Sequence, residues 1–506
     1  MEKNYQHIGK FFLLNFVLIS FLLAANTNAQ EEKILARVGD KTISLDEFIR
    51  RAEYTVRPAY CKNNFNIDKK IILNSLIAEK LLAIEAGGNN TFISKAEVQA
   101  YLQGRKEQLM RLYLYNDEVR SKIKLDTNKI NTAFKYAGRE YQISYVSLQD
   151  SLIAKQLEEE IIEKKIPFEK TLHENYNLQE IPEKKVEWSK LEHPLVLDSL
   201  FSKDHKKGDV IGPLKIEDNH YMFIKINSWK NTPAITAKQI ENRYNSVHNT
   251  YEESEAFRGY VEYVKEIMNG KSLDFNKEVF FELADIFGPE YMNSRKTQEE
   301  AFEEGVWDYK KEEMEFRNTK PRLDEIRNEK LFTFDNHDWT VEEFLREIKK
   351  HPLVFREKKF PQNKFGDQLQ LAILDMIRDE CLTKEAYAKG YDDVPGVVRD
   401  NQMWKDNLNS LYEKYRILKE AGKDSLFASN YQEVIKSTLN PYVDSLQYKY
   451  SDKIFINTDL FNNIKLTKID LSVTYANSPF SQVVPNFPLV TTDNKLDYGS
   501  AVKSVP

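Results

Sequence analysis

The chain has 506 residues, of which 41% are apolar and 30% are charged, and its formal net charge is −6. This length allows two to four domains with sizeable cores, and the composition is that of a globular rather than a disordered protein. The acidic balance argues against a general nucleic-acid binder, because phosphate contacts need concentrated Lys and Arg. Cys61 and Cys381 are too few for a disulfide framework, and either one bridge or two buried thiols would fit the sequence.

The first residues predict a targeting segment. Lys3 and Lys10 precede an apolar run over residues 11–25, and small residues at 27–29 suit a cut before Gln30. We interpret residues 1–29 as a secretory signal peptide; an uncleaved anchor is the alternative, although the run is short for a membrane span. We therefore expect an exported protein that is soluble and has no integral membrane span after signal removal.

Residues 30–135 predict an N-terminal helical module. A short strand over 34–38 and a turn lead to Ser44, which is placed to cap a helix beginning at Leu45, with Glu47 in position for a capping box. An amphipathic helix over 69–86 follows and ends at paired glycines. Two further helices are expected, over 95–113 and 117–134.

Residues 330–439 predict a second copy of this arrangement. A strand over 331–334, a turn over 335–338 and a helix start over 339–344 mirror the first module, and a helix over 368–389 mirrors its long helix. The two long helices match at Leu82, Glu85 and Ala86 against Leu382, Glu385 and Ala386. We interpret this as an internal duplication around a different central domain, with chance similarity of two amphipathic helices as the alternative.

Residues 136–230 predict a small mixed domain in which strands and helices follow in the order β, α, α, extended piece, α, β, β. The expected elements are a strand over 141–148, helices over 150–164 and 167–176, an extended piece over 186–188, a short helix over 195–201, and a hairpin with strands over 214–216 and 221–226.

The remaining segments predict connections. Residues 231–329 should form a charged helical connector, with a helix over 237–269 and a solvated arm over 275–327. The arm's aromatic residues, if partly exposed, would suit apolar client segments; they are Phe280, Phe281, Phe287 and Tyr291. Residues 440–506 should form a strand-like, Pro-containing tail, with strands over 453–457 and 464–475 and a loosely held end from residue 491.

The central segment resembles a parvulin-type peptidylprolyl isomerase domain. The likeness is carried by Glu187-Trp188, Phe201-Ser202, Gly208-Asp209-Val210, Gly212-Pro213 and the run from Tyr221 to Ile226. The flanking modules resemble the helical core of SurA-like and PpiC-like periplasmic folding factors, through the run from Val38 to Phe48 and through Glu85-Ala86-Gly87. The likeness covers residues 31–230 and 330–420. It implies an α+β, mostly helical fold, with helical chaperone-core modules flanking a parvulin-like small β-sheet domain.

The resemblance also implies a pocket that lets an Xaa-Pro amide rotate past its barrier without a covalent step. Parvulins line this pocket with a histidine on the first strand and another on the last strand. Here the first position falls on or near Ser144 and the second on Met222, so both histidines are replaced. His220 lies on the same strand face as Met222 and is the remaining candidate, with a solvated hairpin histidine as the alternative.

Three aromatic residues are expected near a peptide-binding surface, although each is equally typical of a core: Trp188, Phe201 and Phe223. No cofactor is expected, because the sequence has no metal-spaced His and Cys cluster, phosphate-binding glycine loop or nucleophile motif.

The resemblance implies an exported folding factor that binds unfolded polypeptides, with outer-membrane proteins among the conceivable clients, and whose isomerase pocket is degenerate. An active peptidylprolyl isomerase and a structural subunit of a cell-envelope assembly are the alternatives.

Overall fold

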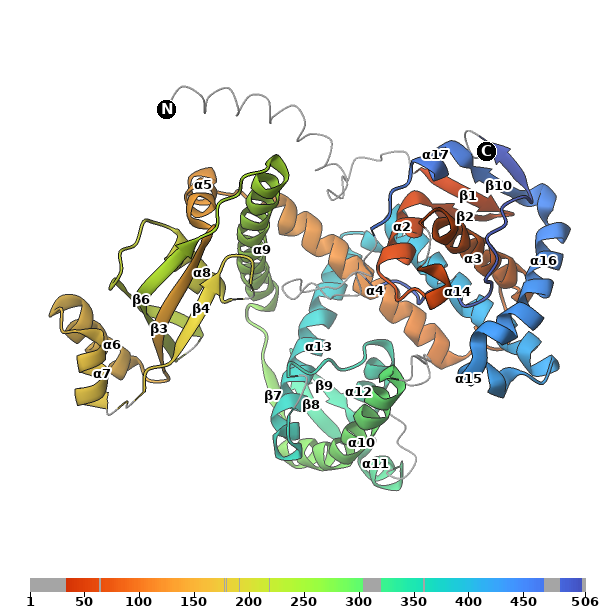
Figure 1. The fold of residues 1–506 in the computed structure, drawn as a ribbon. Helices are drawn as coiled ribbons and strands as arrows, with labels where there is room; N and C mark the ends of the chain where they lie inside the picture. Colours follow the sequence, from red (N-terminus) through yellow and green to blue (C-terminus); the bar gives the residue numbers. More distant parts are fainter. Residues whose placement is uncertain are drawn as a thin grey trace. The chain divides into compact units, whose positions relative to one another are not determined.

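The computed structural model describes residues 33–62, 65–176, 178, 180–190, 192–217, 219–303, 320–357, 360–467 and 483–502. The proposed signal peptide, residues 1–29, lies outside the described residues. Asp117–Tyr263 forms most of one compact unit, unit 2, and the described residues on either side of it form unit 1. Helices dominate, and the sheets have three or four strands, which confirms the α+β, mostly helical class (Figure 1).

The first lobe of unit 1 (residues 33–116 and 395–502) begins as expected. Its first elements are β1 (Ile34–Val38), β2 (Lys41–Ser44), α2 (Leu45–Glu53), α3 (Phe65–Ala86) and α4 (Ala96–Glu118). The Ser44 hydroxyl accepts a hydrogen bond from the Glu47 N–H at 3.0 Å, so the predicted cap is confirmed. The Glu47 carboxylate instead lies 2.9 Å from the Lys80 ammonium, which draws it away from a capping box.

The C-terminal part of the chain completes this lobe. It contributes α14 (Pro395–Glu420), α15 (Asp424–Val434), α16 (Asn440–Lys449), β10 (Ile454–Asn457), α17 (Thr458–Asn463) and β11 (Ser500–Val502). β10 lies antiparallel beside β1, and β11 lies parallel to β10, giving the order β11-β10-β1-β2 (Figure 1). One hydrophobic core contains residues from both ends of the chain.

The expectation of a strand-like tail over 440–506 is wrong in two respects. Residues 440–449 are helical, because Val443 and Leu446 are spaced to bury one face of α16. The described part of the end, residues 491–502, begins with a held residue, because Thr491 is buried and donates to the Asn440 side chain at 2.9 Å. The strand over 453–457 is confirmed within one residue. Of the expected strand over 464–475, residues 464–467 have no regular structure and the rest lie outside the described residues.

The second lobe of unit 1 (residues 264–388) repeats the start of the first. It contains β7 (Leu273–Phe275), α10 (Lys277–Glu303), α11 (Lys320–Ile326), β8 (Lys330–Phe334), β9 (His337–Thr340), α12 (Val341–Lys350) and α13 (Phe365–Ala388). Thr340 caps α12 in a complete capping box with Glu343. Val341 N–H donates to Glu329 O at 3.0 Å, and Leu45 N–H donates to Lys33 O at 2.8 Å at the same place in the first lobe. The predicted repeat therefore extends to strand register and hydrogen bonding.

The part of α10 up to Met292 packs into a core and is not a solvated arm, which corrects the expectation for this part of the chain. Phe280 and Phe287 are buried, because they lie on the face of α10 that packs into the core of the second lobe. Tyr291 is half-buried against an aromatic cluster, with its ring centroid 4.3 Å from that of Phe355. Phe281 alone of the four aromatics is exposed. The two cysteines, Cys61 and Cys381, are both buried, and no disulfide joins them.

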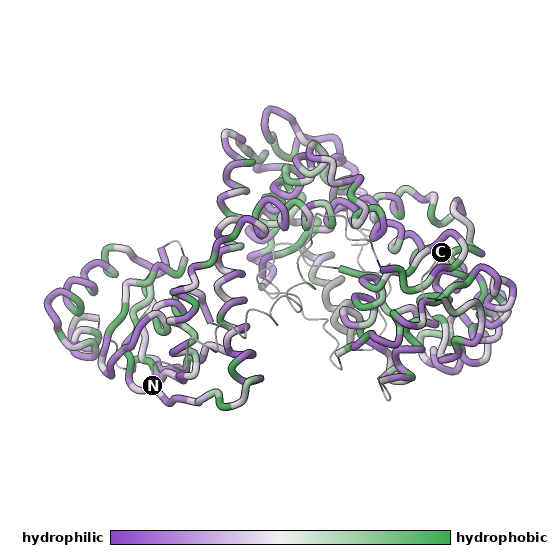
Figure 2. Tube along the Cα trace, turned by 90° about the horizontal axis from the view of Figure 1, so that it is seen from above, coloured by the Kyte–Doolittle hydropathy of each residue, from purple (hydrophilic) through white to green (hydrophobic). Residues whose placement is uncertain are grey.

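Unit 2 is a small sheet with helices on both faces. Its elements are α5 (Thr127–Tyr136), β3 (Arg139–Leu148), α6 (Ser151–Glu158), α7 (Phe168–Tyr176), β4 (Glu183–Glu187), α8 (Pro194–Phe201), β5 (Val210–Glu217), β6 (His220–Asn231) and α9 (Ala237–Met268). The strand order is β4-β3-β6-β5. The core on one face includes residues of α5, α8 and α9, and the core on the other includes residues of α6 and α7. Figure 2 shows hydrophobic stretches inside this unit and hydrophilic residues around its outside.

The expected helix over 117–134 is correct only in its second half. α5 begins at Thr127, because the Asp126 carboxylate accepts from the N–H groups of Asn128 and Lys129 and so sets the helix start. In the described ranges, no helix combines the length and the apolarity needed to cross a membrane.

Candidate functional site

The candidate site is the middle of the sheet in unit 2, where the first strand, β3, lies directly beside the last, β6. The two strands pair antiparallel from Arg139 opposite Asn231 to Leu148 opposite Tyr221. A pocket built from the first and last strands needs this adjacency. Which face each side chain takes is then decided by the alternation of residues along the two strands.

Ser144 and Met222 lie on opposite faces of this sheet. Ser144 is opposite Lys225, whereas Met222 is opposite Ser147, and neighbouring positions along a strand alternate between faces. The two positions expected to replace the pocket histidines therefore do not converge. The β3 residues that share a face with Met222 are Ile143, Tyr145 and Ser147, and Ser147 is directly opposite Met222.

The face with Met222 and Tyr145 is apolar with one cationic neighbour. Met222 is buried in the core that includes Trp188 and Phe201, and the half-buried Tyr145 packs at its margin. The Lys184 ammonium lies 5.2 Å from the centroid of the Tyr145 ring. A thioether has no proton to donate and is a weak acceptor, so Met222 can contact an apolar group but cannot replace a histidine in acid–base chemistry.

On the other face, Ser144 belongs to a closed set of hydrogen bonds. Its hydroxyl accepts from the Asn227 amide at 2.8 Å and donates to the Glu183 carboxylate at 3.3 Å. Asn227 also donates to Glu183, at 3.0 Å. A serine nucleophile needs a base that is itself held by a third group, and no histidine takes part here. The set instead ties the edge strand β4 to β3 and β6.

The three aromatic residues expected at a binding surface are core residues in the structure. Trp188 packs against Phe201 with ring centroids 5.1 Å apart, on the Met222 face. Phe223 is fully buried on the opposite face, in the core with α6 and α7. As placed, none of the three presents its ring to solvent. The Trp188 indole N–H has no acceptor among the described residues, so it is a buried donor that a water or a peptide carbonyl could satisfy.

His220 begins β6 on the face of Met222 and is half-buried at the hairpin end, opposite Glu217. Its Cα lies two residues, or roughly 7 Å, from that of Met222. Sequence reasoning passed over another histidine of this unit, His205, which is buried in the loop between α8 and β5. Its Nε2 lies 2.8 Å from Ser199 O, so His205 fixes this loop. The feature of the sequence that could have pointed to His205 was its position between Phe201 and Gly208.

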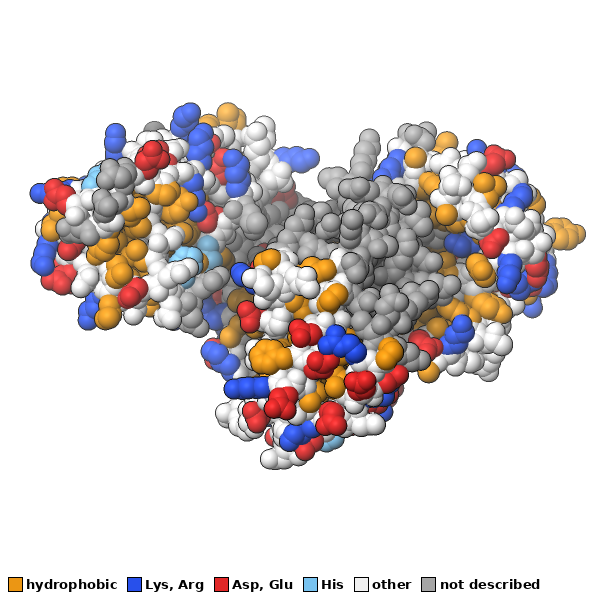
Figure 3. Space-filling model, turned by 90° about the horizontal axis from the view of Figure 1, so that it is seen from below, with side chains coloured by type: hydrophobic (Ala, Val, Ile, Leu, Met, Phe, Trp, Pro, Cys, Tyr) orange, Lys and Arg blue, Asp and Glu red, His pale blue; other side chains and the backbone are white. Residues whose placement is uncertain are grey.

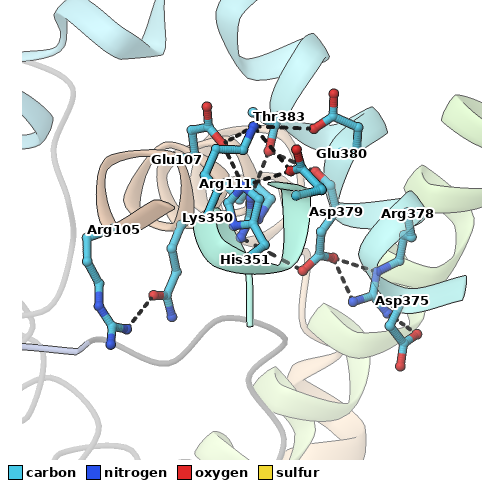
Figure 4. Close-up of polar contacts among 12 residues, drawn as sticks. Arg105, Glu107, Arg111, Lys350, His351, Asp375, Arg378, Asp379, Glu380 and Thr383 are labelled. Atoms are coloured by element: carbon cyan, nitrogen blue, oxygen red, sulfur yellow. Dashed lines mark hydrogen bonds and ion pairs between the residues drawn. The ribbon is translucent and has the colours of Figure 1, made fainter. Parts of the chain in front are cut away.

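A second polar cluster joins α4 to α12 and α13 in unit 1 (Figure 4). The Glu107 carboxylate lies 2.5 Å from His351 Nε2 and 3.3 Å from the Lys350 ammonium. Burial opposes ionisation of Glu107, but hydrogen bonds from His351 and Gln103 outweigh it and lower its pKa to about 2. The cluster lacked a sequence signal, because Glu107 and His351 are 244 positions apart.

This cluster has a structural role, because it holds α4 against the end of α12. A Cβ atom on Gly104 would lie 1.8 Å from Lys350 O, so α4 approaches the end of α12 as closely as only glycine allows. Over the described part of the chain, no group of three or more His, Cys, Asp or Glu side chains is placed to hold a metal ion.

No model of a known protein family matches this chain, and no curated protein sequence matches it.

Proposed function

We propose that the protein is an exported folding factor that binds unfolded polypeptides, and that its parvulin-like domain does not catalyse prolyl isomerisation. The observation that carries this proposal is the β3 and β6 pair. The two strands are adjacent, as a parvulin pocket requires, but on the Met222 face β3 carries Ile143, Tyr145 and Ser147 and no histidine. This combination supports a domain kept for its fold rather than for its chemistry.

Surface composition supports weak binding to varied partners. Large apolar side chains are exposed in both units; examples are Leu152, Ile235 and Phe257 in unit 2 and Phe281, Val354 and Tyr448 in unit 1. On the face of the molecule that Figure 3 shows, hydrophobic side chains lie among charged side chains of both signs. Scattered apolar contacts of this kind suit transient binding of unfolded chains, since no single pocket selects one sequence. The proposal includes export to the periplasm, because residues 1–29 are interpreted as a secretory signal peptide. It also includes outer-membrane proteins as conceivable clients.

The proposal is tested by light scattering. The mature chain from Gln30 onward is mixed with three unrelated, chemically unfolded proteins as they are diluted from denaturant. We expect aggregation of all three to fall as the chain approaches equal molar amounts. Unchanged aggregation of all three would contradict the proposal, and co-purification with one stoichiometric envelope partner would favour the structural-subunit alternative.

His220 gives the isomerase alternative a specific basis, because it lies on the Met222 face. A protease-coupled assay on an Xaa-Pro peptide distinguishes the two functions. We expect the uncatalysed rate in the presence of the chain. Acceleration that is lost in His220→Ala and kept in His173→Ala, which changes an exposed histidine of α7, would establish the enzyme instead.

A further inference from the structure

The repeat within unit 1 includes the strand beside each hairpin. In the first lobe β10 runs antiparallel to β1, with Ile454 opposite Val38. In the second lobe β7 runs antiparallel to β8, with Leu273 opposite Phe334. Val38 and Phe334 end the first strand of their hairpins, so β7 occupies the place of β10.

The hydrogen bonding at these strands is repeated as well. Gly39 N–H donates to Lys453 O at 2.9 Å, and Asp335 N–H donates to Ser272 O at 3.1 Å. Each acceptor directly precedes its strand, and each donor lies in the hairpin turn. In β10 and in β7, the N–H and C=O groups at corresponding alternate positions therefore point toward the neighbouring hairpin.

The outer edges of these two strands differ. β10 is covered by β11, which runs parallel to it with Ser500 opposite Phe455. β7 is the edge strand of the sheet β7-β8-β9, and within the described ranges no strand pairs with its outer side. Asn276 N–H donates inward to Leu331 O at 3.0 Å, so alternation directs the N–H and C=O groups of Leu273 and Phe275 outward. Such an edge can accept another strand.

The segment that enters β11 also covers α3. The Tyr498 hydroxyl donates to the Asn74 side chain, and Asn74 donates to Asp493 O at 2.8 Å. α3 and α13 begin at Phe65 and Phe365, which places Leu374 where α3 has Asn74. Leu374 is 39% exposed, so the second lobe has an uncovered apolar side chain at this place.

Two acidic side chains lie at or next to the open edge, with the exposed Lys277 between them in the sequence. Asp274, in the middle of β7, and Glu278, in the first turn of α10, are both exposed, and no described side chain forms an ion pair with either. Asp274 has the position that Phe455 has in β10, which is opposite Ser500. A strand added here would gain from a Lys or Arg at the position of Ser500.

We propose that the β7 edge binds an extended, basic segment of an unfolded polypeptide by parallel strand addition, as β11 is added to β10. An aromatic residue of the segment packs at Leu374, and a Lys or Arg two residues later lies beside Asp274. This inference rests on the proposed function and adds how a client is held: backbone hydrogen bonds supply affinity for many sequences, and the two side-chain positions supply preference.

The probe is a fluorescein-labelled peptide that copies residues 495–502 with Lys in place of Ser500, followed by fluorescence anisotropy with the mature chain. We expect saturable binding of one peptide per chain, weakened by salt. A matched peptide with Glu at that position should bind at least threefold more weakly. Equal binding of the two peptides would overturn the assignment of a basic segment.

Backbone pairing is tested by N-methylation of the peptide. Ile456 is opposite Ala501 and points toward β11, so it bonds to Ser500 and Val502 rather than to Ala501. We therefore expect N-methylation at the position of Val502 to weaken binding at least tenfold, and N-methylation at the position of Ala501 to leave it unchanged. The same loss at both positions, or at neither, would overturn strand addition without any change to the protein.

Two protein variants locate the site. Leu273→Pro removes an N–H group that points outward and leaves the hydrogen bonds between Asp274 and β8 in place. We therefore expect this variant to lose peptide binding while its unfolding midpoint stays close to that of the parent chain. Asp274→Lys should reverse the preference in favour of the Glu peptide. Full peptide binding by Leu273→Pro would place the peptide elsewhere and overturn the site.

The outcomes separate this inference from the proposed function. If the chain suppresses aggregation but binds no peptide, the strand-edge inference is wrong and the folding function stands. If the peptide binds but the chain does not change the aggregation of unfolded proteins, the proposed folding function is wrong, and the β7 edge does not hold clients. Sedimentation that shows a dimer dissociated by the peptide would make a second copy the occupant and would overturn the assignment to an unfolded polypeptide.

Discussion

At the scale of single residues, two serines differ in what holds them: Ser44 bonds to a residue three positions away, whereas Ser144 bonds to residues of two other strands. Ser44 caps its helix as the sequence predicts, because a cap depends on neighbours three positions away. Ser144 failed as a pocket residue, because shifting an alignment by one position along a strand moves every side chain to the other face. Tyr145 and Ser147 were thus the β3 residues to consider beside Met222, and only the pairing of β3 with β6 shows this.

Gly104 gives a prediction at this scale. Gly104→Ala should lower the free energy of unfolding by about 1–3 kcal/mol, because its Cβ meets the backbone oxygen of Lys350 and neither helix backbone can move cheaply. Gly366→Ala is the control, since a Cβ there meets nothing within 4 Å. Urea denaturation measures both. Equal urea midpoints for Gly104→Ala and the parent chain would mean that α4 and α12 are not held this closely.

The buried ion pair between Arg51 and Glu79 gives a second prediction. Both side chains are fully buried, two hydrogen bonds of 2.9 and 2.8 Å join them, and Asn407 donates to Glu79 at 2.8 Å. Glu79→Leu should cost about 3–5 kcal/mol, because the guanidinium stays buried without its partner. The double variant with Arg51→Met should recover most of the loss in the same denaturation experiment. A double variant as unstable as Glu79→Leu would contradict this account.

Glu107 gives a pH dependence. Its folded pKa of about 2 lies below the ordinary 4.5, so its carboxylate stabilises the fold above pH 4.5, and this stabilisation is lost as the pH falls toward 2. We expect Glu107→Gln to flatten the decline of the unfolding midpoint between pH 4.5 and 2, with Glu159→Gln, at an exposed surface ion pair, as control. Parallel curves for the parent and Glu107→Gln would show that the ion cluster does not act in this way.

At the scale of elements, the helices and hairpins were predicted better than their partners. α3, α13 and both hairpins carry strong local periodicity and turn residues. β10 was predicted as a strand, but its pairing with β1 joins positions more than 400 residues apart, such as Ala36 and Ile456, and no local pattern encodes it. The prediction of a solvated arm was wrong for α10, because its many charged residues suggested full exposure to solvent although one face, which includes Phe287, is buried.

The C-terminal strand gives a prediction for elements. Deleting residues 498–506 should lower the unfolding midpoint of the first lobe, because β11 and the Tyr498 contact with Asn74 are lost from the edge of its sheet. Gly499→Ala should act in the same direction, since the φ of Gly499 is +73°, which favours glycine, and a Cβ atom there would lie 2.6 Å from Ile454 O. Hydrogen exchange of β10 amides reports both changes. Unchanged exchange would mean that this end of the chain contributes no stability.

At the scale of the whole molecule, the sequence predicted two repeated modules around a mixed domain, and the structure groups the chain differently. The first lobe needs both ends of the chain, the second lobe takes its strand β7 and helix α10 from the expected connector, and α9 contributes to the core of unit 2. Segment boundaries drawn along the sequence could not show this, because they assume that each domain is continuous.

The central claim is that the protein distinguishes unfolded from folded polypeptides. The most direct measurement is the affinity of the mature chain for one test protein in two forms: native, and permanently unfolded by reduction and carboxymethylation. Fluorescence anisotropy with each labelled form should show saturable binding of the unfolded form, weakened at least tenfold or absent for the native form. Equal affinity for the two forms, or no binding of either, would contradict the account.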